Sequence, residues 1–181
     1  MKNCIILLLC AIGFNSSIFA QDSLPPLPKD YTLNVTTLNS TITSYYNVLS
    51  AGKEGERDWA LYKHLFHYKA KLIPTSIVND TLFDARYLEP QNYIDVSSEW
   101  LTENGFIVKE IHRETQRFGN MAHVFSTYEA KHNQTDETPF LRGINSFQML
   151  YDGKRWWIIN LYWSLEHKEN PIPKTFLPTT N

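Results

Sequence analysis

The sequence predicts an α+β fold in which helices come first and a curved antiparallel sheet follows. Mainly helical patterns lie between residues 38 and 104, and alternating strand patterns fill the chain from residue 106 onward. The clearest signal is a C-terminal hairpin, in which two runs rich in β-branched and aromatic residues flank Asp152-Gly153. Three of the five tryptophans lie in this hairpin, so both faces of the sheet need cover from water.

Residues 1–20 have the pattern of a cleavable secretory signal peptide. Lys2 precedes a mostly apolar run at 4–14, and the segment ends with the small residue Ala20. We expect cleavage after Ala20 and export to the periplasm or the extracellular space. Both cysteines, Cys4 and Cys10, lie inside the signal, so the mature chain is expected to have no thiol and no disulfide. No later run approaches the ~18 consecutive apolar residues that a membrane span needs.

The mature chain is expected to form one domain at 37–168, because its length suits a single hydrophobic core. A proline-containing, extended lead-in at 21–36 precedes this domain, and a proline-rich tail at 169–181 follows it. The full chain has 17 basic and 19 acidic side chains, and removing Lys2 with the signal changes the net charge from −2 to −3. This near-neutral balance gives no support for a nucleic-acid partner.

Three helices are expected, and local signals mark their ends. Asp58 is a good N-cap for the second helix, whose apolar stripe extends to Phe66. Glu89-Pro90 begins the third helix, and Asn104-Gly105 ends it. The first helix is indicated by apolar side chains at helical spacing before a stop at 50–52: Leu38, Ile42, Tyr45, Tyr46 and Leu49.

Strands make up the remainder of the domain. One short strand is expected at 70–73, between the second and third helices. Four longer strands follow the third helix, at 106–116, 121–131, 140–151 and 156–166. Asp152-Gly153 is typical of a two-residue type I′ turn, and strands joined by such turns pair antiparallel.

Three segments of the chain resemble a group of bacterial NTF2-like proteins that have no assigned reaction. The segments are GERDWALYKHLF (55–66), RFGNMAHVFSTYEA (117–130) and RGINSFQMLYDGKRWWIINLYWSLE (142–166). The NTF2-like superfamily includes nuclear transport factor 2, ketosteroid isomerase and the SnoaL-like proteins. The resemblance implies a cone of about three N-terminal helices packed on a curved antiparallel sheet. It also implies a pocket at the mouth of the cone and usually a dimer, but no catalytic residues.

The alternation of the hairpin strands predicts which side chains face the cone. A two-residue turn would place Asn145 opposite Asn160, Phe147 opposite Ile158 and Met149 opposite Trp156, and a turn one residue longer would exchange these partners. The candidate ligand-binding residues on this face are Asn145, Phe147, Trp156, Asn160 and Tyr162. The opposite face is apolar without interruption and predicts a homodimer through the outer sheet face; it carries Trp157, Ile159, Leu161, Trp163 and Leu165.

His123 is the candidate catalytic residue, because an imidazole on a strand could act as a general base near neutral pH. The alternative is a structural histidine with a satisfied hydrogen bond. Asn145 and Asn160 could polarise a ligand carbonyl or bond to each other across the hairpin. His64 and His67 could share one side of a helix, but no third ligand is evident, so we expect no metal and no cofactor.

Two classes of function fit these patterns. The favoured hypothesis is an exported domain that binds a small, mainly apolar molecule in its cone, because the sequence has no acid/base constellation. The alternative is an enzyme of the ketosteroid isomerase or SnoaL-like kind, which would transfer a proton on a small carbonyl compound with His123 or a carboxylate as base. A protein interaction module that uses the apolar outer face is a third hypothesis.

Overall fold

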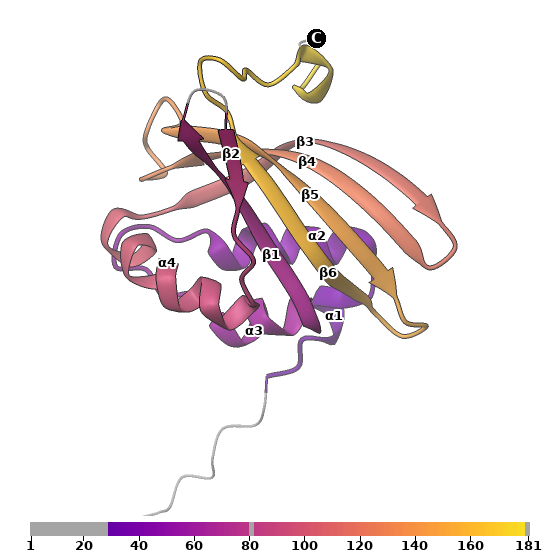
Figure 1. Cartoon of the computed structure of the whole chain (residues 1–181). Helices are drawn as coiled ribbons and strands as arrows, with labels where there is room; N and C mark the ends of the chain where they lie inside the picture. The colour runs from indigo at the N-terminus through magenta and orange to yellow at the C-terminus, as the bar shows by residue number, and fades with distance from the viewer. Residues whose placement is uncertain (1–28, 80–81, 180–181) are drawn as a thin grey trace, which may run out of the picture.

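The computed structural model describes residues 29–79 and 82–179 (Figure 1). The expected signal peptide at 1–20 and the lead-in up to residue 28 lie outside the described residues. The elements, in chain order, are α1 (Thr32–Val35), α2 (Leu38–Leu49), α3 (Trp59–Leu65), β1 (Phe66–Asn79), β2 (Leu82–Ala85), α4 (Pro90–Asn104), β3 (Ile107–Phe118), β4 (Met121–Lys131), β5 (Leu141–Tyr151), β6 (Trp156–Leu165) and the 3-10 helix η1 (Lys174–Phe176).

The strands of the described chain form one six-stranded sheet in the order β2-β1-β6-β5-β4-β3. Neighbouring strands pair antiparallel except for β1 and β6, which are parallel. The sheet curves over α2 and α3, and η1 lies beyond its other side (Figure 1). The α+β class and the curved sheet are confirmed. The expected number of helices is too low, because α1 forms inside the segment expected to be extended, and the sheet is not purely antiparallel.

Short-range hydrogen bonds explain where the longer helices begin and end. Thr37 and Ser40 form a reciprocal capping box at the start of α2. The carboxylate of Asp58 accepts a backbone N–H of the first turn of α3 at 3.0 Å. Pro90 occupies the first turn of α4, and Gly105 ends that helix with a φ of 71° that disfavours other residues. Each of these signals acts within one helical turn.

The core lies between the helices and the face of the sheet that they cover, which we call the inner face. Aromatic rings dominate it, because Tyr45 packs edge-on against Phe147 at 5.1 Å between ring centroids, and Tyr62 lies 5.0 Å from Phe66. The largest fully buried apolar side chains are Tyr62, Phe147, Ile42, Leu65, Leu72, Met149, Ile158, Leu161 and Val124.

The β5–β6 hairpin has a longer connection than a two-residue turn. Tyr151 pairs with Trp156, so residues 152–155 form a four-residue loop. The side chain of Asp152 closes this loop by accepting two backbone N–H groups, each at 2.8 Å. The expected cross-strand pairs are wrong: Asn145 pairs with Trp163, Phe147 with Leu161 and Met149 with Ile158.

β6 also contains a bulge at Ile159, because adjacent β5 residues 148 and 149 pair with Asn160 and Ile158. The extra residue reverses the alternation of side chains beyond it. Leu161 is therefore buried on the inner face, and Tyr162 faces outward with 47% of its surface exposed. The expectation that Asn160 and Tyr162 share the inner face, and Leu161 and Trp163 the outer one, is wrong for this reason.

β1 is much longer than the strand expected at 70–73. Its middle pairs with β6, and its end pairs with β2, a strand that was not expected from the sequence. Among the described residues, none of the helices combines the length and the apolar character needed to cross a bilayer.

Candidate functional site

A cavity of about 180 Å³ lies between the helices and the inner face of the sheet, and we call it the inner cavity. Helices α2 and α4 and strands β3 to β6 contribute its walls. Most of the lining is aliphatic or aromatic, including Leu49, Val108, Leu141 and Trp163. A concave, mainly apolar surface with few polar groups is typical of a small-molecule site.

The polar atoms of the cavity wall include several without a hydrogen-bond partner in the described chain. They include the hydroxyl groups of Tyr45 and Tyr128, the indole N–H of Trp163 and the amide oxygen of Asn145. Within the described residues, the inaccessible side-chain polar atoms without a partner are on Tyr62 and His112, so the polar atoms named for the cavity wall remain accessible. Burial raises the pKa of Tyr45 and of Tyr128, so both phenols can donate at neutral pH.

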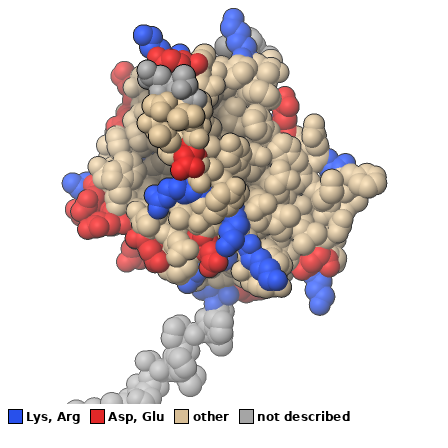
Figure 2. All heavy atoms as spheres, in the orientation of Figure 1, with Lys and Arg blue, Asp and Glu red and all other residues tan. Residues whose placement is uncertain are grey.

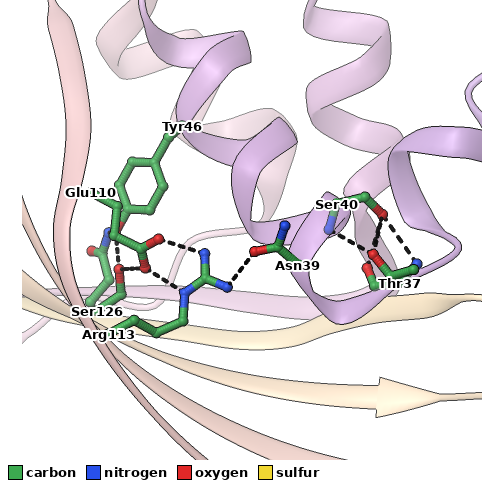
Figure 3. Close-up of polar contacts among 8 residues, drawn as sticks. Thr37, Asn39, Ser40, Tyr46, Glu110, Arg113 and Ser126 are labelled. Atoms are coloured by element: carbon green, nitrogen blue, oxygen red, sulfur yellow. Dashed lines mark hydrogen bonds and ion pairs between the residues drawn. The ribbon is translucent and has the colours of Figure 1, made fainter.

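A chain of hydrogen bonds, which we call the relay, runs from the cavity wall to a carboxylate. Asn145 Nδ2 donates to the Tyr46 hydroxyl at 2.9 Å, and that hydroxyl lies 2.7 Å from Ser126 Oγ. Ser126 Oγ donates to Glu110 Oε1 at 2.5 Å. Figure 3 shows Tyr46 reaching from α2 toward Ser126 and Glu110. The relay therefore connects the amide of the cavity wall with an ionisable group outside the cavity lining.

Arg113 holds the carboxylate of Glu110 in place. Its Nε and Nη2 atoms donate to the two carboxylate oxygens at 2.7 and 2.5 Å, and Nη1 donates to Asn39 of α2 at 2.9 Å (Figure 3). The side chains of Arg113 and Glu110 are 20% and 21% exposed. Bidentate pairing fixes both the charge and the orientation of a carboxylate. This ion pair ties β3 to α2 and presents one oxygen to Ser126.

Glu110 and Arg113 share the inner face because β3 contains a bulge at Ile111. The adjacent β4 residues 127 and 128 pair with His112 and Glu110, which leaves Ile111 without a cross-strand partner in this ladder. Regular alternation places residues three apart on opposite faces of a sheet. Regular alternation in the sequence therefore does not indicate Glu110, and the Glu-x-x-Arg spacing is the one signal for the ion pair.

The residues expected to line the pocket lie in three different places. Asn145 lines the inner cavity. Phe147 and Trp156 belong to the core, where 0% and 4% of their surfaces are exposed. Asn160 and Tyr162 face outward because of the bulge in β6. The structure therefore brings one of the five residues to the cavity that the others were expected to share.

His123 lies on the outer face of the sheet, opposite to the inner cavity. Its Nε2 atom lies 2.9 Å from Ser146 Oγ on the neighbouring strand. Val124 and Ala122, the residues on either side, are buried on the inner face. The sheet thus separates His123 from Asn145 and the relay, and a general base in the cavity would have to be another group.

The C-terminal segment packs on the outer face. The backbone N–H of Ile172 donates to Glu166 at 3.0 Å, and the hydroxyl of Thr127 donates to the Phe176 carbonyl at 2.7 Å. The ring of Phe176 lies 5.0 Å from that of Phe125. A groove of about 270 Å³, the outer groove, remains between this tail and the sheet. The chain's own tail therefore covers part of the face that was expected to bind a second copy.

The two histidines considered for a metal site do not share a helix. His64 belongs to α3, whereas His67 follows in β1. His64 Nε2 lies 2.7 Å from the guanidinium of Arg155, and burial together with this positive charge lowers the pKa of His64. Within residues 29–79 and 82–179, no group of three or more His, Cys, Asp or Glu side chains is placed to hold a metal ion.

Comparisons with known proteins place this geometry in a fold family. No protein-family model and no curated protein matches the sequence. The structure is similar to a candidate calcium/calmodulin-dependent protein kinase type II association domain from Thiobacillus denitrificans, with a TM-score of 0.55, 9% identity and coverage of 72% of this chain and 96% of that one.

Two further solved structures carry names of enzymes. A candidate scytalone dehydratase from Novosphingobium aromaticivorans gives a TM-score of 0.53 at 12% identity, over 80% of this chain and 91% of that one. A candidate ketosteroid isomerase from Parabacteroides distasonis gives a TM-score of 0.50 at 13% identity, over 78% of this chain and 96% of that one. At these identities the similarity establishes a shared fold and no shared activity. The chain has the NTF2-like fold that its sequence motifs implied.

Proposed function

We propose that this protein binds a small, mainly apolar molecule in the inner cavity. The observation that carries the proposal is the lining: aliphatic and aromatic walls surround a few polar atoms that have no partner within the described chain. Such walls supply binding free energy through buried area, and the polar atoms orient the ligand.

The volume of the cavity limits the size of the ligand. A dry protein cavity of ~150 Å³ is large enough to bind benzene. The inner cavity, at about 180 Å³, therefore suits a molecule of one ring.

Binding is favoured over catalysis by the chemistry of the cavity wall. The described lining contains no Asp, Glu, His, Lys or Arg side chain. His123 lies on the other face of the sheet, and both oxygens of Glu110 are occupied by Arg113 and Ser126. A general acid or base must reach the reacting atoms directly or through one water, and none of these groups does so.

Proton transfer on a small carbonyl compound is the second candidate function, and the relay favours it. The relay is a continuous hydrogen-bond path from the cavity to a carboxylate, and two structures of similar fold carry the names of a candidate ketosteroid isomerase and a candidate scytalone dehydratase. Deuterium exchange of cyclohexanone α-protons tests this candidate. Catalysed exchange that Glu110→Gln abolishes supports an enzyme, and the binding proposal expects no catalysed exchange.

The binding proposal is tested by filling each cavity in turn. Leu141→Trp places a large ring in the inner cavity, and Ile144→Trp on the same strand places one in the outer groove. Titration calorimetry with phenol is expected to show affinity reduced about tenfold or more by Leu141→Trp and little changed by Ile144→Trp. An equal loss of phenol affinity in both variants, or no binding of phenol by the wild type, would contradict the proposal.

We also propose that the chain is exported and that the mature protein forms a homodimer through the outer sheet face. The proposed export is tested by the intact mass of the secreted protein, which should begin at Gln21. Support for the dimer comes from the side of the molecule occupied by β4 to β6, which presents few charged side chains (Figure 2). Interfaces are depleted of charge at their centres in the same way.

A further inference from the structure

The relay admits one arrangement of protons. Both carboxylate oxygens of Glu110 accept from Arg113, so Ser126, 2.5 Å from Oε1, donates to this carboxylate as well. A serine hydroxyl has one proton, and therefore the Tyr46 hydroxyl donates to Ser126 in turn. The oxygen of Tyr46 can then only accept from Asn145, which does so through Nδ2.

The opposite orientation of the Asn145 amide leaves one hydrogen bond of the relay without a proton. If its oxygen faced Tyr46, the phenol would donate to Asn145, and Ser126 would have to donate to Tyr46. Ser126 and Glu110 would then meet at 2.5 Å as two acceptors with no proton between them. The charge on Glu110 thus fixes an amide three hydrogen bonds away. Asn145 is 3% exposed, and its oxygen remains as an acceptor without a protein partner in the described chain.

We infer that the inner cavity selects a ligand with a hydrogen-bond donor, a one-ring alcohol or phenol, over a ketone of the same size. This inference rests on the proposed binding function. A ligand that fills the cavity displaces water from the Asn145 oxygen, and leaving a buried acceptor unpaired is unfavourable. The Tyr128 hydroxyl can serve either ligand, because it donates and accepts. Glu110 and Ser126 act as positioning residues through the relay.

Cyclohexanol and cyclohexanone test this selectivity, since they have the same number of non-hydrogen atoms and differ in the donor. Calorimetry with the wild type is expected to show the alcohol binding roughly three- to tenfold more tightly than the ketone. This ratio of affinities corresponds to the net contribution of one hydrogen bond. Ser126→Ala frees the proton of Tyr46 and lets the amide turn, so the ratio should fall toward one. Ser146→Ala, on the outer face beside His123, should leave the ratio unchanged.

The outcomes separate the inference from the proposed function. Failure of both compounds to bind the wild type overturns the proposed function and the ligand class with it. Equal affinities, or a preference for the ketone, overturn the ligand class alone. If Ser126→Ala does not fold, Tyr46→Phe removes the same constraint and should give the same fall in the ratio.

The relay can also be tested without a ligand. In the wild type, NMR should detect nuclear Overhauser contacts between the side-chain amide protons of Asn145 and the ring of Tyr46, because Nδ2 faces the phenol. These contacts should weaken in Ser126→Ala. Their absence from the wild type would overturn the inferred proton arrangement.

Discussion

Tyr45 and Tyr46 are neighbours in α2, and their hydroxyl groups have different roles. Both side chains are almost fully buried, with 6% and 4% of their surfaces exposed. The Tyr46 hydroxyl bonds to Ser126 and Asn145, and burial raises its pKa while these two bonds oppose the rise. The Tyr45 hydroxyl has no hydrogen bond within the described chain and lines the cavity. The two positions form a matched pair for measuring the relay.

Tyr46→Phe should lower the free energy of unfolding by about 1–3 kcal/mol, because it leaves the buried groups of Asn145 and Ser126 without a partner. Tyr45→Phe removes a hydroxyl that bonds to no described residue and should change stability by less than about 0.5 kcal/mol. Urea denaturation at neutral pH gives both values. Similar losses in the two variants would mean that the relay contributes no stability of its own.

At the scale of elements, helix ends could be predicted from the sequence and strand faces only in part. Asp58, Pro90 and Gly105 act on their own helical turn, so their identity was enough to place the ends of α3 and α4. A bulge depends on how two strands pair, and no residue type marked those at Ile111 and Ile159.

These bulges decided how much of the candidate site could be predicted. Asn145 lies on the inner face of the sheet, as expected, because β5 alternates without interruption. Glu110 was missed and Tyr162 was assigned to the wrong face, since each lies next to or beyond a bulge. The length of β1 was underestimated because its pairing with β2 and β6 is also non-local.

The β5–β6 loop should make stability depend on pH. The indole N–H of Trp157 and the backbone N–H groups of Arg155 and Lys154 lower the pKa of Asp152 to about 2. Because the folded pKa is below the ordinary value of 3.8, the stabilisation is complete above that value and is lost as the pH falls toward 2. Asp152→Asn should therefore melt below the wild type at pH 6, and the difference should shrink between pH 4 and pH 2.

Thermal unfolding at pH 6, 4, 3 and 2 measures this difference. Glu99→Gln, at an exposed position of α4, is the control and should melt close to the wild type throughout. A gap between Asp152→Asn and the wild type that stays constant or widens toward pH 2 would contradict the role given to Asp152.

At the scale of the whole molecule, the tail occupies part of the outer face that the proposed dimer would use. The tail covers the sheet around Phe125 and Thr127, while Trp157 and Ile159 lie outside the outer groove that it forms. Trp163, which was expected at the dimer interface, lines both the inner cavity and the outer groove. A dimer through this face would therefore depend on the part of β6 near Ile159.

Light scattering of the mature protein at micromolar concentration should give the mass of a homodimer. Ile159→Glu should lower the measured mass to that of a monomer, because a charge at the centre of an apolar interface is strongly unfavourable. Val96→Glu, at a position of α4 that is 60% exposed, should leave the dimer intact. A monomeric wild type would mean that the tail is sufficient cover for the outer face.

Methyl NMR on the mature protein during a cyclohexanol titration tests the central claim, ligand binding in the inner cavity, most directly. Val108 and Leu141 line the inner cavity, whereas Ile144 and Ile172 line the outer groove. We predict saturable shifts and ligand Overhauser contacts at the methyl groups of Val108 and Leu141, with those of Ile144 and Ile172 unchanged. Contacts at the outer groove alone, or no saturable shift at either site, would contradict the account.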